Sequence, residues 1–266
     1  KGMDNEEEPD STEDLPEELD LRDKMVIHGA IHQGLTCNSC GWVAGTQALE
    51  ARIGFVSENY IPYSIQNFMN CAGRVCVGAQ PYSVTTAARK YGVIVPESEI
   101  PYTQKECLSQ GEKKTACFEK CGNLHRESFS NALDDQFVVI AGTGHADTEA
   151  SLMKALQDGP LTTCFSKKRV EEEGRACSSG CTHANTIIGY TKDSWLLQES
   201  YGKHWGQFDD GSWLTTKGSN CGNSINKKAF FPRIFYDYDR ANAFYTPEVG
   251  GVKEEELEFV EDGVTD

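Results

Sequence analysis

The chain has 266 residues, 38% of them hydrophobic and 10% aromatic, a length that allows one large domain or two small ones. Its net charge of −16 lies at the ends, because residues 1–20 hold ten acids and one lysine and residues 241–266 hold eight acids and one lysine. The neutral body has no basic excess, which argues against a nucleic-acid partner, and no apolar run approaches the roughly 20 residues of a membrane span.

Helices are predicted in the first half of the chain. The run that follows Cys40 has apolar positions at near-helical spacing and good helix formers, which predicts a helix over about 40–54. The stretch YSIQNFMNC (63–71) predicts a short helix with Ser64 as N-cap. A third helix is predicted in PYSVTTAARKYG (81–92), since proline suits its early turn and glycine its C-cap.

From about residue 136, short β-rich runs alternate with clusters of Gly, Asp and Ser. One helix interrupts them in DTEASLMKALQDGP (147–160), where acids mark its start and Gly159 and Pro160 its end. Helices first and strands second predict an α+β chain with two lobes. The predicted strands are FVVIA (137–141), PLTTCFS (160–166), ANTIIGY (184–190), SWLLQES (194–200), GSWLTT (211–216) and AFFPRIF (229–235).

Two cysteines, Cys37 and Cys40, stand three residues apart in the stretch QGLTCNSCGW. The chain has eleven cysteines, which indicates an oxidising compartment and leaves one over as a reactive thiol or an intermolecular link. A zinc site would need a second ligand pair, and a thioredoxin-type redox pair belongs in a βαβ setting that this region lacks. The third interpretation makes Cys37 a half-cystine and Cys40 a free thiol at a helix N-terminus, which favours the thiolate.

A nucleophilic thiolate needs a base, and His183 is the best candidate because it opens a β-rich run 143 residues after Cys40. Four stretches, LPEELDLRD, QGLTCNSC, THANTIIGY and ESYGKHWG, resemble in order and interval the landmarks of papain-like cysteine peptidases, the family of the cathepsins. The resemblance covers roughly residues 15–235. It implies a two-lobed α+β fold, with a helical N-terminal lobe, a β-barrel-like C-terminal lobe and the active site in the cleft between them.

The resemblance also implies how the chain is divided. We expect a mainly helical lobe at 15–130 that carries the nucleophile and a β-rich lobe at 131–240 that carries the histidine. An acidic N-terminal segment at 1–14 and an acidic C-terminal tail at 241–266 would flank them.

The family pattern implies catalytic roles for three residues. Cys40 stands where the family's cysteine attacks the peptide carbonyl, and His183 where a histidine pairs with that thiolate and protonates the departing amine. Gln33 matches the glutamine whose side-chain amide forms the oxyanion hole with the backbone N–H of the nucleophile. Such a donor contributes about 3–4 kcal/mol in comparable sites. The reaction needs no metal or organic cofactor.

The family pattern further implies a substrate groove and disulfides. Gly78 and Ala79 lie in the stretch whose backbone pairs with an extended substrate. The positions that build the main specificity pocket hold Pro81, Cys164, Cys181, Ala184 and Asn226. Disulfides are implied between Cys37 and Cys76, Cys71 and Cys107, and Cys177 and Cys221, and position and parity suggest Cys117 with Cys121 and Cys164 with Cys181.

Three positions near the site depart from the family pattern. Gly41 replaces a tryptophan beside the nucleophile, which alters the groove floor and loosens a helix turn by about 1 kcal/mol relative to alanine. Tyr201 replaces a tryptophan that shields the histidine's hydrogen bond, which predicts a wetter bond. Glu199 replaces the asparagine that orients the imidazole. A carboxylate can accept the same N–H bond, but it is longer and charged.

We therefore expect a cysteine peptidase in which Glu199 orients His183. One alternative is a catalytically inactive or impaired homologue that binds peptides or serves as a structural protein, and another replaces hydrolysis by acyl transfer. The expected partners are a peptide or protein substrate and a pro-segment or protein inhibitor, because the family is usually made as zymogens. The expected location is a lysosome, a vacuole, another secretory-pathway compartment or the extracellular space.

Overall fold

A computed structural model describes residues 12, 14–91, 94–104, 138–165, 182–217 and 229–236. The described chain combines helices with an antiparallel sheet, so the predicted α+β class is confirmed. Most of the predicted acidic ends, 1–14 and 241–266, lie outside the described residues. No helix in the described ranges is both long and apolar enough to cross a membrane.

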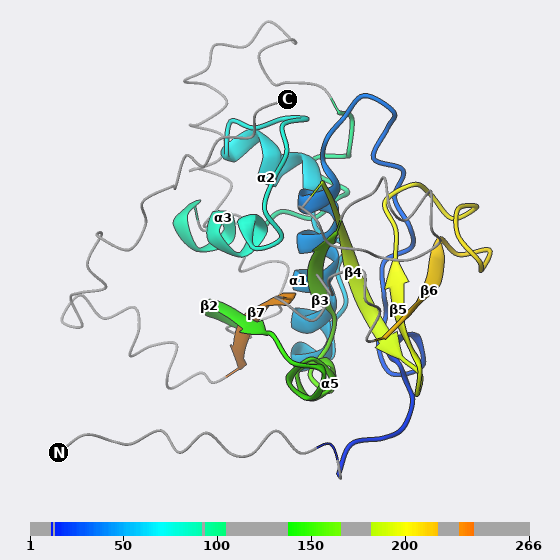
Figure 1. The fold of residues 1–266 in the computed structure, drawn as a ribbon. Helices are drawn as coiled ribbons and strands as arrows, with labels where there is room; N and C mark the ends of the chain where they lie inside the picture. The colour runs from blue at the N-terminus through cyan, green and yellow to red at the C-terminus, as the bar shows by residue number, and fades with distance from the viewer. Residues whose placement is uncertain are drawn as a thin grey trace, which may run out of the picture.

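The helical lobe is built around α1 (Cys40–Ser57), with α2 (Ile65–Cys71) and α3 (Ser83–Tyr91) packed beside it (Figure 1). The hydroxyl of Ser64 accepts a hydrogen bond from the backbone N–H of Asn67, as the N-cap prediction requires. The first helix ends at Ser57 rather than near residue 54. Its C-cap is Glu58 in the left-handed region, with φ of 55°, and not a glycine that the sequence would reveal.

The second lobe is an antiparallel sheet in which the strands follow the order β2-β7-β3-β4-β5-β6. Its strands are β2 (Val138–Ala146), β3 (Leu161–Phe165), β4 (His183–Tyr190), β5 (Ser194–Gln198), β6 (Ser212–Thr216) and β7 (Ala229–Tyr236). Each of the six predicted β-rich runs therefore forms a strand. Strand β1 (Leu19–Asp20) pairs with the end of β4 and leads into the 3₁₀ turn η1 (Leu21–Asp23).

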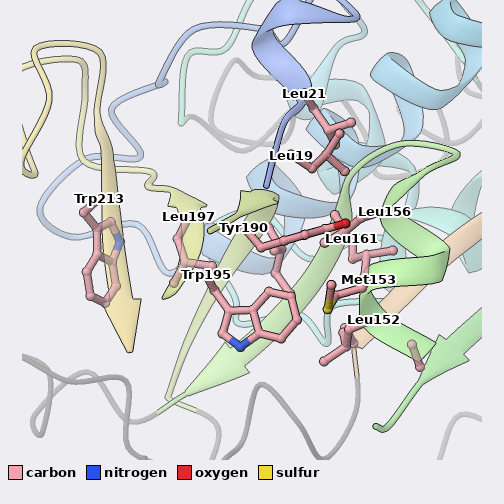
Figure 2. Packing of buried hydrophobic residues seen from close by; sticks show 13 residues of the cluster. Leu19, Leu21, Leu152, Met153, Leu156, Leu161, Tyr190, Trp195, Leu197 and Trp213 are labelled. Carbon is pink, nitrogen blue, oxygen red and sulfur yellow. The ribbon is translucent and has the colours of Figure 1, made fainter. Parts of the chain in front are cut away.

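Helix α5 (Glu149–Leu156) interrupts the strands where the sequence predicts it. Thr148 and Ser151 form a reciprocal capping box at its start. The helix packs its leucines on the sheet lobe, and Figure 2 shows Tyr190 and Trp195 beside these side chains. The rings of Tyr190 and Trp195 meet edge to face, with centroids 6.1 Å apart. Leu19 and Leu21 also belong to this core, although they precede the helical lobe in the chain.

Helix α1 is the wall that the two lobes share. Fourteen of its 18 residues are buried, which is the pattern of a helix enclosed on nearly all sides. It contacts α2 and α3 of the helical lobe and β3, β4 and β7 of the sheet lobe (Figure 1). The helical lobe has its own core, formed by Trp42, Leu49 and Phe68 among others. The first residue of α1, Cys40, contacts the start of β4 in the sheet lobe.

Candidate active site

Cys40 is the first residue of α1, and its thiol is free and partly exposed. The preceding Ser39 makes no side-chain cap, because its hydroxyl lies 2.6 Å from the hydroxyl of Tyr102. The first-turn N–H of Gly41 and the N–H of Ala184 instead donate to the sulfur. Burial raises the pKa of the Cys40 thiol, but these two donors and the hydrogen bond and charge of His183 lower it, and the lowering prevails.

His183 is the first residue of β4 and is 3% exposed. Its Nε2 lies 2.7 Å from a carboxylate oxygen of Glu199, and it also hydrogen-bonds to Cys40. Burial by itself lowers the pKa of His183, but the hydrogen bonds and charges of Cys40 and Glu199 raise it to about 9. The imidazole is therefore protonated at neutral pH and faces a sulfur that favours the thiolate.

Glu199 directly follows β5 and is 1% exposed. One of its oxygens, Oε2, meets His183, while the other, Oε1, accepts hydrogen bonds from Asn185 Nδ2 and from Trp213 Nε1, the latter at 3.1 Å. A buried carboxylate is costly unless it is paired and hydrogen-bonded, and both oxygens of Glu199 have partners.

Tyr201 lies flat against His183, with ring centroids 4.9 Å apart and an angle of 5° between the ring planes. Trp205 packs against Tyr201 at 5.5 Å and against Trp213 at 5.9 Å. Tyr201 thus covers one face of the imidazole, Trp213 contacts the carboxylate, and both His183 and Glu199 are almost fully buried. The prediction of a wetter bond is therefore wrong, because Tyr201 itself stacks on His183 and little of the bond is exposed to solvent.

Gln33 is 7% exposed and is fixed at both ends of its amide. Its Nε2 donates to the carbonyl of Cys37 at 2.8 Å, and its Oε1 accepts from the hydroxyl of Ser200. The backbone of Gln33 is held as well, because its N–H donates to the Ser200 carbonyl at 2.8 Å and its carbonyl accepts from Tyr102 at 2.9 Å. The amide carries a second N–H, which is the donor that an oxyanion hole requires.

A disulfide between Cys37 and Cys76 ties the loop before α1 to the segment that follows α2. Cys71 and Cys164 each take part in a further disulfide. Their predicted partners lie outside the described residues, as do the members of the other two predicted pairs. The cysteines concerned are Cys107, Cys181, Cys117, Cys121, Cys177 and Cys221.

Gly41 permits a close approach between the nucleophile's helix and the predicted substrate-binding segment. A Cβ atom added at Gly41 would lie 2.1 Å from the backbone carbonyl oxygen of Ala79. No side chain fits there, because backbone occupies the space. Trp42 turns into the helical core, where its Nε1 donates to the Val77 carbonyl at 3.4 Å. Next to Ala79, a Cβ at Gly78 would meet no atom within 4 Å, so its backbone is open to a ligand.

The predicted pocket positions come from two lobes. Pro81, in the helical lobe, is tied to the sheet because its carbonyl accepts a hydrogen bond from Thr162 at 3.1 Å. Cys164 and Ala184 are directly opposite one another on β3 and β4. Cys164 and Ala184 are thus neighbours on the sheet, and Pro81 contacts β3 at Thr162, two residues before Cys164. The other two positions, Cys181 and Asn226, lie outside the described residues.

Several contacting residues escape prediction from sequence, namely Asn185, Ser200, Trp213 and Tyr102. Asn185 had a usable signal, because residues two apart on a strand share a face, and it stands two residues after His183. Trp213 reaches Glu199 from β6, and Tyr102 comes from a loop far along the chain, so only the tertiary fold places them. No cluster of three or more His, Cys, Asp or Glu side chains suited to a metal occurs within the described ranges.

The sequence profile of the family described as "Papain family cysteine protease" matches residues 15–233. The chain belongs to this family. Curated relatives include cathepsin Q of Rattus norvegicus, 27% identical over 214 residues that cover 72% of this chain and 56% of that protein. Zingipain-2 of Zingiber officinale is 24% identical over 206 residues, which cover 73% of this chain and 86% of that protein. This papain-family chain thus spans little more than half the length of the cathepsin.

Solved structures of papain-family proteins share the fold. The Carica candamarcensis cysteine protease CMS1MS2, in complex with E-64, superposes with a TM-score of 0.62 at 20% identity and covers 82% of this chain and 98% of that one. The ragweed pollen protease Amb a 11, in its proform, superposes with a TM-score of 0.64 at 23% identity. The match covers 82% of this chain and 65% of that one. These likenesses confirm the predicted papain-like fold with a helical lobe and a β-rich lobe.

Proposed function

We propose that this protein is a cysteine peptidase in which Cys40, His183 and Glu199 act as a catalytic triad. The observation that carries the proposal is the chain of contacts from a free, partly exposed thiol through a buried imidazole to a buried carboxylate. Each link has the chemistry of its place: a sulfur with a lowered pKa, a base that is protonated at rest and an acceptor that fixes the imidazole.

In the first half of the proposed reaction, the Cys40 thiolate attacks the carbonyl carbon of the scissile peptide. The negative charge that develops on the carbonyl oxygen meets the backbone N–H of Cys40 and the second N–H of Gln33. His183 holds Glu199 through Nε2, which leaves Nδ1, 3.3 Å from the hydroxyl of Tyr201, to give its proton to the departing amine. The carbon–nitrogen bond breaks and a thioester remains on Cys40.

In the second half, neutral His183 removes a proton from a water molecule that attacks the thioester. The carboxylic acid leaves, and the thiolate and imidazolium are restored. Glu199 keeps the imidazole in one orientation during both proton transfers and stabilises its charged form. An extended peptide or protein substrate would pair with the backbone at Gly78 and Ala79 and place a side chain near Pro81, Cys164 and Ala184.

The partners and location follow from the family and remain part of the proposal. A pro-segment or a protein inhibitor would occupy the same groove as the substrate. Disulfides at Cys37, Cys71 and Cys164 fit a lysosome, vacuole, other secretory compartment or the extracellular space.

Labelling with an epoxide or vinyl-sulfone thiol trap tests the proposal against an inactive homologue. The wild type should label once and cleave peptides, and Cys40→Ala should do neither. His183→Gln is a second control, because it keeps the thiol while removing the base. A wild type that neither labels nor cleaves would show an inactive homologue, and products joined to an added amine would show acyl transfer.

A further inference from the structure

Glu199 meets more donors than a single hydrogen bond to His183 requires. Its Oε2 faces His183 at 2.7 Å, while its Oε1 takes both the amide N–H of Asn185 and the indole N–H of Trp213. The donors come from β4 and β6, the strands on either side of β5, and are 1% and 5% exposed. In this dry environment neither oxygen of Glu199 depends on water.

The orientation of the Asn185 amide follows from the acceptor that it faces. Its Nδ2 donates to Oε1 of Glu199, whereas the flipped amide would place its own oxygen against a carboxylate oxygen, two acceptors in contact. The Oδ1 of Asn185 is buried and has no hydrogen-bond partner among the described residues. The bond to Glu199 therefore sets which way the amide turns.

This set of donors suits a carboxylate and opposes an amide. A carboxylate offers two acceptor oxygens, one for His183 and one for the pair Asn185 and Trp213. An amide offers one oxygen and one NH₂. If its oxygen satisfies the two donors, its NH₂ points at Nε2 of His183 and imposes the wrong tautomer. If its oxygen faces His183, its NH₂ meets two other N–H groups.

We infer that Asn185 and Trp213 are positioning residues that hold Glu199 with one oxygen on His183, so that this site works with a carboxylate and rejects the neutral amide. The inference rests on the proposed function for its catalytic meaning. The geometry it describes is measurable without peptide cleavage, through the reactivity of the Cys40 thiol.

The test is a set of variants in two backgrounds, with Glu or Gln at position 199. The readouts are the rate of Cys40 alkylation by iodoacetamide at pH 6, kcat and KM for a peptide, and Tm. In the Glu background, Asn185→Leu and Trp213→Phe should each slow alkylation and lower kcat by about 10- to 100-fold, the size of a lost hydrogen bond to a charged group, with KM little changed. Glu199→Gln alone should lower both rates by at least about 100-fold through the wrong tautomer.

The deciding result is whether the two substitutions change the alkylation rate and kcat in opposite directions in the two backgrounds. In the Glu199→Gln background, Asn185→Leu and Trp213→Phe should not lower the alkylation rate or kcat. They should instead raise both by up to about 10-fold, because the amide oxygen of Gln at position 199 is freed to turn toward His183. A merely structural role predicts the same loss in both backgrounds. Equal losses in the two backgrounds, or no loss in the Glu background, would overturn the inference.

Thr186→Val is the matched control. Thr186 is the next residue on β4 and is equally buried, but its hydroxyl donates at 2.9 Å to Gln47 of α1 rather than toward Glu199. Its effect should be the same with either residue at 199, and a reversal there would count against the inference. Should Asn185→Leu fail to fold, Trp213→Phe still removes the N–H donor while keeping an aromatic ring at this position.

The two proposals can fail separately. If the wild type cleaves no peptide and the alkylation rates still reverse, the peptidase proposal fails and the positioning inference stands. If the wild type cleaves peptides and the effects of the substitutions simply multiply, the inference alone is refuted.

Discussion

At the scale of single residues, the imidazole of His183 lies between the sulfur of Cys40 and the carboxylate of Glu199. Burial lowers its pKa, yet the two neighbours raise it to about 9. Burial raises the pKa of the Cys40 thiol, but the hydrogen bond and charge of His183 lower it, with help from the backbone of Ala184 and Gly41. The thiolate–imidazolium pair therefore persists over a range of pH that ends, on the alkaline side, as the pH rises through about 9.

A pH dependence follows from the raised pKa of His183. Because the imidazolium is the acid that protonates the leaving amine, kcat/KM should fall as the pH rises through about 9. Glu199→Gln removes a negative charge beside the imidazole, so the alkaline limb should move to lower pH. The measurement is kcat/KM for a peptide between pH 4 and about 10. An alkaline limb at the same pH in both proteins would contradict this account of the pKa.

Gly41 gives a second prediction. In a helix, alanine is favoured over glycine by about 1 kcal/mol, but a Cβ at this position would lie 2.1 Å from the backbone oxygen of Ala79. We expect Gly41→Ala to lower the free energy of unfolding by about 1–3 kcal/mol, as overpacked sites do. Urea denaturation measures this. Gly29→Ala is the control, because a Cβ there meets nothing within 4 Å. A stabilised Gly41→Ala protein would disprove the clash.

At the scale of secondary-structure elements, α1 is linked to the sheet lobe by a buried guanidinium. Arg52 is 5% exposed and donates to the carbonyls of Ala155, Gly159 and Pro160 at 2.7, 2.9 and 2.8 Å. It also lies over the ring of Phe231, 4.7 Å from the centroid. Burial lowers the pKa of Arg52 to about 10 against the charge of Asp158, so it is still charged at neutral pH. Arg52 therefore caps the Ala155 carbonyl in the last turn of α5 and holds the carbonyls of Gly159 and Pro160 in the loop that leads to β3.

Replacement of Arg52 should uncouple α1 from the end of α5. Arg52→Met keeps the volume but leaves buried carbonyls without donors, and we expect a loss of about 3 kcal/mol in the free energy of unfolding. Arg52→Lys should recover only part of this, because an ammonium lacks the planar fork of the guanidinium. Urea denaturation of the three proteins measures both effects. A Met variant as stable as the wild type would refute the capping role.

A second contact ties the segment before the nucleophile to α1. His28 Nδ1 lies 3.2 Å from a carboxylate oxygen of Glu50, which is 1% exposed. The hydrogen bond to Glu50 and the charges of Glu50 and Glu97 raise the pKa of His28 above 6.5, although burial opposes them. A raised pKa in the folded state gives stability that is complete below the unfolded-state value and is lost as the pH rises through the folded-state value.

His28→Gln should therefore lower Tm at pH 5 and have little effect at pH 9. Thermal unfolding of both proteins at the two pH values tests this, and Glu50 is left unchanged so that its other contacts persist. An equal fall in Tm at both pH values would show that His28 acts through packing and not through its charge.

Sequence alone predicts the elements well where the signals are local. Ser64 and the acids Asp147 and Glu149 mark helix starts, and each β-rich run becomes a strand. The family spacing also predicts Cys40, His183 and Glu199, which form one chain of contacts, and Gln33, whose amide donates to the carbonyl of Cys37. What the sequence does not reveal is long-range: why position 41 requires glycine, and which strands supply donors to Glu199. Both depend on how backbone and side chains distant in the sequence pack.

At the scale of the whole molecule, the two lobes have separate cores and share α1 (Figure 1). Cys40 begins this helix, whereas His183 begins a strand of the other lobe. The Cys40–His183 contact thus spans the boundary between the two cores. Hydrogen bonds such as that from Thr186 on β4 to Gln47 of α1 hold the boundary together.

Hydrogen exchange should reveal this organisation. Amides of the buried middle of α1 and of β4 belong to the region where both cores meet, so they should exchange last. Amides of α3, a short helix on which Arg89 is exposed and Ser83 and Thr86 are half-buried, should exchange earlier. Exchange followed by mass spectrometry on peptides of each element gives the order. Faster exchange in α1 than in α3 would show that the lobes open along this helix under native conditions.

The placement of the sulfur and the imidazole on opposite sides of one boundary has a practical consequence for anyone who handles the protein. A slight parting of the lobes would separate the reactive pair while every helix and strand stayed intact. Circular dichroism would then report an unchanged sample whose thiol had already become sluggish. The competent fraction of a preparation is better counted by titrating that thiol than by any spectrum of the backbone.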